Sequence, residues 1–150
     1  MGTAYATWVD DVVDSVKETI ADTTTFDGDP GTVFYAWIDN PSENPYCRID
    51  LDTDNFILRG GKYDSRAYQQ RLNIQLRVVW IGGFTETDYD TFIKYIGEIT
   101  TAIESDETLG GTYIETSYIT DVSWSRNRRG NALTHVAVIT LKVEGSRDAV

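Results

Sequence analysis

The sequence predicts an α+β fold in a single domain, with elements in the order α-β-β-β-α-β-β. Two observations lead to this expectation. Apolar and polar residues alternate from Arg71 to Trp80, which is the period of a strand with one buried face. Two other segments, residues 4–21 and 89–103, repeat apolar residues at the spacing of an amphipathic helix.

The first helix is expected over residues 4–21. Trp8, Val12, Val16 and Ile20 fall at helical spacing, and acidic residues lie outside that stripe. Its β-branched residues lower the intrinsic helix propensity, so packing against a sheet must supply most of the stability.

Two strands are expected after the turn-forming residues 23–32. Residues 33–38 are β-branched and aromatic, and residues 46–51 alternate weakly. Residues 52–68 show the least regular pattern and are interpreted as a protruding arm or loop, because unstructured connections of this length are usually functional. The long strand then covers residues 69–81.

The second helix is expected to begin after Thr85, which forms a capping-box-like pair with Asp88. It is expected to end at Leu109-Gly110-Gly111. Residues 113–125 and 132–144 predict a hairpin across residues 126–131. Residues 145–150 are expected to form a flexible tail.

The charge of the chain limits its partners. At 150 residues it carries a net charge of -11, with sixteen Asp and only four Lys. Such a surface disfavours nonspecific binding to nucleic acid or anionic membranes. The composition fits either a halophilic protein, whose repulsions are screened by salt, or an acidic mesophilic one. With one cysteine, no recognisable secretion signal and no long apolar run, a soluble protein made in the cytoplasm is expected.

No catalytic, cofactor-binding or metal site is predicted. His135 is the one histidine that could serve as a base, and its parity places it with the core residues of the last strand. Asp50, Asp52 and Asp54 match the start of a calcium loop, but Asn55 and Gly61 stand where that loop needs Gly and Glu. A solvated acidic turn is favoured over weak cation binding. The four tryptophans are interpreted as core residues: Trp8, Trp37, Trp80 and Trp124.

Basic side chains supply the candidate interface. Arginine can bind carboxylates or phosphates bidentately, so each basic group could contact a neighbouring subunit or DNA, or could simply be solvated. Three groups qualify: Arg126, Arg128 and Arg129 at the hairpin tip; Arg59, Lys62 and Arg66 on the arm; and Arg71 and Arg77 on the polar face of the long strand. That polar stripe contains no acid, which suits a subunit interface, a polar lumen or a solvated face.

The element order and length resemble the tail-terminator, or tail-completion, proteins of long-tailed phages and tailed archaeal viruses. The final strand resembles theirs too, with Arg128-Arg129, then His135, then alternating aliphatic residues to Leu141. The resemblance implies a mixed, mainly antiparallel sheet with two helices packed on one face.

The resemblance also implies a function. A homohexameric ring would cap the tail tube, end its polymerisation and join the tail to the head or neck, after assembly in the host cytoplasm. Its partners would be copies of itself, the tail-tube protein and a neck or head-completion protein, with genome DNA passing through the lumen without sequence-specific binding. Alternatives are a neck or head-closure protein, a tail-tube subunit, or a small cytoplasmic enzyme or metal-binding or ligand-binding domain with an acidic site.

Overall fold

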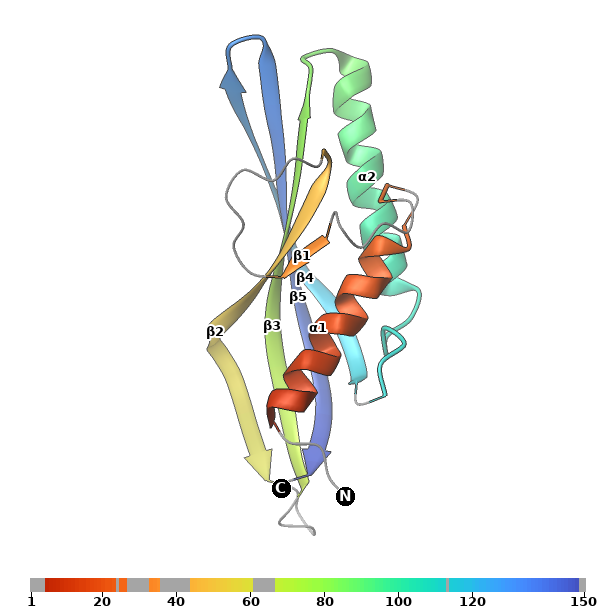
Figure 1. The fold of residues 1–150 in the computed structure, drawn as a ribbon, viewed down its shortest axis with the longest axis vertical. Coiled ribbons are helices and arrows are strands. Elements are labelled where there is room, and N and C mark those ends of the chain that lie inside the picture. Colours follow the sequence, from red (N-terminus) through yellow and green to blue (C-terminus); the bar gives the residue numbers. More distant parts are fainter. Residues whose placement is uncertain are drawn as a thin grey trace.

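The computed structural model describes residues 5–23, 25–26, 33–35, 44–60, 67–112 and 114–148, with side chains omitted at 5–6, 34–35, 52–60, 67–70, 129 and 146–148. The described elements follow the predicted order α-β-β-β-α-β-β (Figure 1). They are α1 (Tyr5–Ala21), β1 (Val33–Tyr35), β2 (Tyr46–Gly60), β3 (Ala67–Gly82), α2 (Glu86–Glu104), β4 (Ile114–Arg129) and β5 (Ala132–Asp148).

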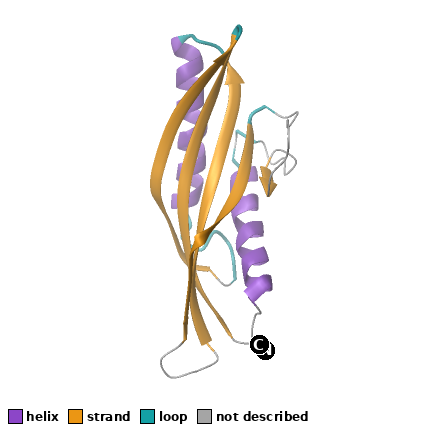
Figure 2. Ribbon diagram, turned by 90° about the vertical axis from the view of Figure 1, so that its left-hand side faces the viewer, coloured by secondary structure: helices purple, strands orange, loops and turns teal. Residues whose placement is uncertain are grey.

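The strands form one sheet in the order β1-β2-β3-β5-β4. β1 pairs with β2 in parallel, and the other three pairings are antiparallel. Both helices lie on the same side of this sheet (Figures 1 and 2). The expected α+β fold, a mixed and mainly antiparallel sheet with two helices on one face, is confirmed. Because β3 and β5 are paired on both edges, they form the centre of the sheet.

The core lies between the helices and one face of the sheet. The alternating residues of β3 supply Leu72, Ile74, Leu76 and Val78, each no more than 3% exposed. The α1 stripe predicted from the sequence is buried in the same core, and burying a side chain of that size contributes roughly 1.5–3 kcal/mol. The remaining core positions come from α2 and β5: Phe92, Ile96, Ile99, Ile103, Ala137, Ile139, Leu141 and Val143.

The start of α2 was predicted correctly and its end was not. The hydroxyl of Thr85 accepts a hydrogen bond from the Asp88 backbone at 3.1 Å, and the Asp88 carboxylate accepts one from the Thr85 backbone at 3.2 Å. The helix ends at Glu104, before the predicted glycine stop. Leu109 and Gly110 do have positive φ angles, of 51° and 69°, but they belong to the turn that follows.

Two segments that were expected to be irregular contain strand. Residues 52–60 continue β2 and residues 67–68 begin β3, with a shift in pairing between Asp52 and Ile57. Residues 145–148, expected to be a flexible tail, pair with β3. These ends of β2, β3 and β5 lie side by side (Figures 1 and 2). Backbone pairing between distant segments forms them, so local patterns gave little sign of it. Residues 61–66 and 149–150 lie outside the described part of the chain.

The hairpin between β4 and β5 is tighter than expected. β4 continues to Arg129, so the turn consists of Gly130 and Asn131 instead of residues 126–131. Gly130 has a φ of 60°, which glycine adopts without the strain that a Cβ would introduce. Four residues of the predicted turn, 126–129, are therefore strand residues with fixed register.

Cys47 is fully buried in β2, opposite Val78. Burial, with a smaller contribution from the charge of Asp50, raises the pKa of the thiol from about 9 to about 12. In the unfolded chain the thiol ionises first, so its contribution to stability is complete below pH 9 and is lost as the pH rises toward 12.

We expect the free energy of unfolding to fall more steeply between pH 9 and 11 in the natural protein than in Cys47→Ala. The difference between the two slopes should approach about 1.4 kcal/mol per pH unit. Urea denaturation at several pH values measures it. Parallel slopes in the two proteins would contradict the burial of this thiol.

Candidate functional site

The hairpin end of β4 carries two arginines on the helix side of the sheet. Arg126 lies opposite the buried His135 and Arg128 opposite the buried Leu133, so both share the face of the core residues. The guanidinium carbon of Arg126 is 4.3 Å from the centre of the Tyr89 ring. That of Arg128 is 5.1 Å from the centre of the Phe84 ring. These are cation–π distances.

Exposed aromatic residues surround these arginines. Phe84 is 45% exposed and Trp124 is 43% exposed, although Trp124 was expected in the core. The correction has a simple cause. β4 is an outer strand, and the Phe92 ring packs edge to face with the indole ring of Trp124, 5.7 Å between centroids, without covering it. We call Phe84, Tyr89, Trp124, Arg126 and Arg128 the tip patch.

The arginines of the tip patch remain available for a partner. Neither forms an ion pair with any side chain that the structure describes. The Nε–H of Arg128 donates to the backbone oxygen of Gly130 at 3.3 Å, and an aromatic ring beneath a guanidinium leaves the remaining N–H groups at its edge able to bind a carboxylate. The side chain of Arg129, the third residue predicted for this site, lies outside the described side chains.

His135 lies in the core beneath the tip patch and packs against its Tyr89 ring. Its ring is fully buried, with centroids 5.2 Å from Trp80 and 5.3 Å from both Tyr89 and Phe92. Nε2 lies 3.2 Å from the backbone oxygen of Gly83, to which it donates in the tautomer protonated there. The predicted core position of His135, with a ring nitrogen bonded to a neighbour, is confirmed.

Neither of the two described helices lies on the opposite face of the sheet. Arg71 and Arg77 lie there, on a polar stripe of β3 that contains no acid, but the neighbouring strand β5 brings an acid to the same face. Glu144 lies opposite Arg71, and its Oε1 is 2.7 Å from Nη2 of that arginine. Such cross-strand pairs join residues far apart in the sequence, so a local pattern does not reveal them.

The predicted acidic turn is a strand. Asp50, Asp52 and Asp54 belong to β2, and an extended strand does not wrap oxygen ligands around a cation as a calcium loop does. Asp50 instead accepts a salt bridge from Arg48 at 3.0 Å. Among the residues described, no group of three or more potential ligands is placed to hold a metal ion.

The arm residues receive only partial placement. Arg59 lies in β2, opposite Gln69 of β3, while Lys62 and Arg66 fall in the gap between the described ranges. None of the helices described is long and apolar enough to cross a membrane.

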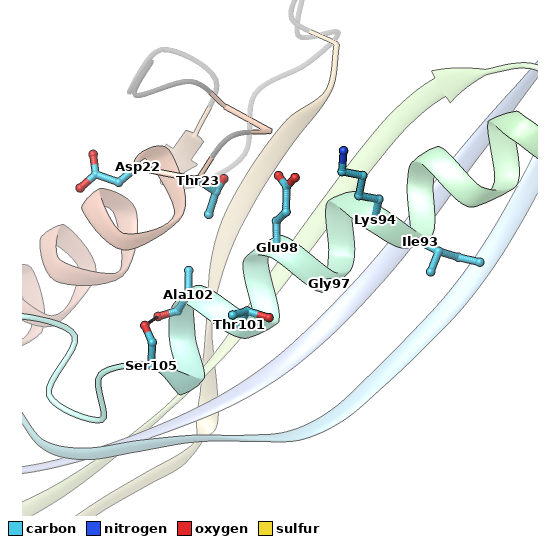
Figure 3. Close-up of a pocket in the computed structure, with 9 residues that line it drawn as sticks. All are labelled: Asp22, Thr23, Ile93, Lys94, Gly97, Glu98, Thr101, Ala102 and Ser105. Atoms are coloured by element: carbon cyan, nitrogen blue, oxygen red, sulfur yellow. Dashed lines mark hydrogen bonds between the residues drawn. The ribbon is translucent and has the colours of Figure 1, made fainter.

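A groove between the end of α1 and the outer side of α2 was not predicted (Figure 3). It measures about 660 Å³, and a smaller hollow beside it shares Asp22 and contains Glu18 and Asp106. Small residues create the space, because Gly97 has no other atom near the position of a Cβ. We call it the helix groove; its lining is Asp22, Thr23, Ile93, Lys94, Gly97, Glu98, Thr101, Ala102 and Ser105.

Glu98 connects the two sides of the helix groove by a hydrogen bond near the end of α1. Its Oε2 accepts a hydrogen bond from Thr25 Oγ1 at 2.5 Å, which links α2 to the segment after α1. The second carboxylate oxygen has no hydrogen bond to a described residue. Carboxylates outnumber the one lysine, Lys94, in and beside the groove. In the sequence, the helix groove is indicated only by two small residues, Gly97 and Ala102, on the polar face of α2.

We expect His135→Ala to lower the free energy of unfolding by about 3 kcal/mol, because it removes a buried ring between Trp80 and Phe92. Thr134→Ala, one residue away on the other face of β5, should cost less than about 0.5 kcal/mol. Urea denaturation of both variants checks this. A similar small loss in both would show that the imidazole does not support the tip patch.

Comparisons with known proteins show similarity to solved structures only. The sequence matches no family model, and no curated protein is similar to it at a significant level. A chain of a solved structure described as "Virion of native gene transfer agent (GTA) particle" is similar over 84% of each chain, with 12% identity and a TM-score of 0.48. That similarity concerns the course of the backbone, and no function is inferred from it.

Proposed function

We propose that this protein is a structural virion protein of the tail-terminator type. In this proposal, copies assemble into a homohexameric ring. The ring caps the tail tube, stops its polymerisation and joins the tail to the head or neck. The protein makes and breaks no bonds in this role. Assembly takes place in the host cytoplasm, and the product resides in the tail or neck of the virion.

One observation carries the proposal. The subunit presents two exposed surfaces of different chemistry, the tip patch and the helix groove, on different sides of α2. A closed ring requires such a pair, because each subunit contacts one neighbour with one surface and the other neighbour with a second surface. The element order that resembles tail-terminator proteins supports the same proposal.

The tip patch has the composition of a protein interface. Tryptophan, tyrosine and arginine are the residues that dominate binding energies, and here they lie together and partly exposed. The proposed partners are further copies, the tail-tube protein and a neck or head-completion protein. DNA would pass through the lumen of the ring without sequence-specific contacts.

Native mass spectrometry and negative-stain imaging of the purified protein test this function at low and high salt. We expect rings of fixed subunit number that persist as protein concentration rises. Closed rings with no growth fit a terminator, which must end a polymer. Filaments that lengthen with concentration would favour a tail-tube subunit instead. A monomer under all conditions would overturn the proposal.

A further inference from the structure

We propose that the tip patch of one copy docks into the helix groove of the next copy. This inference rests on the proposed ring and names the residues that would join its subunits. Arg126 and Arg128 are the anchors, and the carboxylates in and beside the groove are their partners. The occupant of the groove is therefore a second copy of this chain.

The first argument is the separation of charge between the two layers of the fold. The helices and the turns that directly follow them carry twelve described acidic side chains and only two lysines, Lys17 and Lys94. The described side chains of the strands include more basic than acidic residues. The helix-layer acids are Asp10, Asp11, Asp14, Glu18, Asp22, Glu86, Asp88, Asp90, Glu98, Glu104, Asp106 and Glu107; the strand-layer bases are Arg48, Arg71, Arg77, Arg126, Arg128 and Lys142.

Within the strand layer, the tip arginines are better suited to an intermolecular contact than those in the middle of the sheet. Arg48 and Arg71 already form salt bridges with carboxylates of their own chain. Arg126 and Arg128 instead lie over aromatic rings. Their guanidinium edges can therefore form new charge-assisted hydrogen bonds without breaking an existing ion pair.

The receiving surface has complementary charge. Glu98 and Asp22 line the groove, and Glu18 and Asp106 line the hollow that continues it. Figure 3 shows Glu98 and Lys94 rising from the same side of α2, with Thr23 facing Glu98. Ile93, 52% exposed, adds an apolar surface at one end of the groove. An aromatic and arginine patch thus meets a partner that offers both carboxylates and apolar contact.

A single chain does not satisfy both surfaces by itself. The tip patch lies beside the first turn of α2, on the side of β4, where Arg126 contacts Tyr89. The groove lies farther along α2, on the side of α1. Because the two surfaces are distinct and face different sides, the contact repeats from copy to copy in one direction. That geometry produces a ring when the rotation closes.

Charge reversal at each surface tests the contact by native mass spectrometry. Arg126→Glu with Arg128→Glu, and separately Asp22→Lys with Glu98→Lys, should each raise the apparent dissociation constant of the subunits about tenfold or more. Combining the four changes in one chain should restore assembly. Mixing the two double variants should also restore assembly, as rings in which they alternate, because the natural tip then meets the natural groove and the reversed tip meets the reversed groove.

Matched controls separate this contact from a general effect of charge. Arg77→Glu alters an exposed arginine of the sheet face, and Glu115→Lys alters an exposed acid of β4, so neither should change the assembly. Thermal melting establishes that each variant is folded. If Glu98→Lys disrupts folding through its bond to Thr25, Asp22→Lys alone tests the groove.

The outcomes distinguish the contact from the proposed function. If the natural protein forms rings and both charge-reversal variants form them equally well, this inference is overturned and the proposed ring still stands. Disruption by Arg77→Glu as strong as by the tip variant would also overturn it, because the sheet face would then be the interface. A natural protein that never assembles would overturn the proposed function itself.

Discussion

The one-sided burial of β3 and β5 is the constraint on which the rest of the structure depends. Both strands are paired on each edge, so their side chains can point only to the two faces of the sheet. One face meets α1 and α2 and contains residues such as Leu76 and Ile139, which are fully buried. The hydrophobic effect drives this packing and holds the two helices in a single layer. The packing also stabilises α1, whose β-branched residues are weak helix formers.

Covering only one face dictates the chemistry of the other surfaces. The open face of the sheet carries two ion pairs, Arg48 with Asp50 and Arg71 with Glu144, and a buried apolar pair, Val79 and Val136. The outward sides of the helices carry most of the described carboxylates. A chain with a net charge of -11 therefore still exposes Arg126 and Arg128 at the end of its hairpin, because most of its described acids lie in the helix layer. Long-range attraction between unlike layers favours oriented contacts, although salt weakens it.

The tip patch follows from the position of β4 at the edge of the sheet. An outer strand has a neighbour on one side only, and Phe92 of α2 covers Trp124 incompletely. The remaining aromatic surface at this end lies under Arg126 and Arg128. His135 anchors the arrangement because it is buried among Trp80, Tyr89 and Phe92. The same packing that completes the core thus fixes the residues proposed to bind the next subunit.

Side-chain patterns along the chain predict four features: the order of elements, the buried stripes of α1 and β3, the capping box at Thr85 and the core position of His135. These features depend on side-chain chemistry repeated over a few neighbouring residues, which the sequence displays directly. The tertiary structure alone decided the exposure of Trp124, the salt bridge between Arg71 and Glu144, and the helix groove. Each of these depends on which distant segments become neighbours, and that choice is made by the packing of the whole chain.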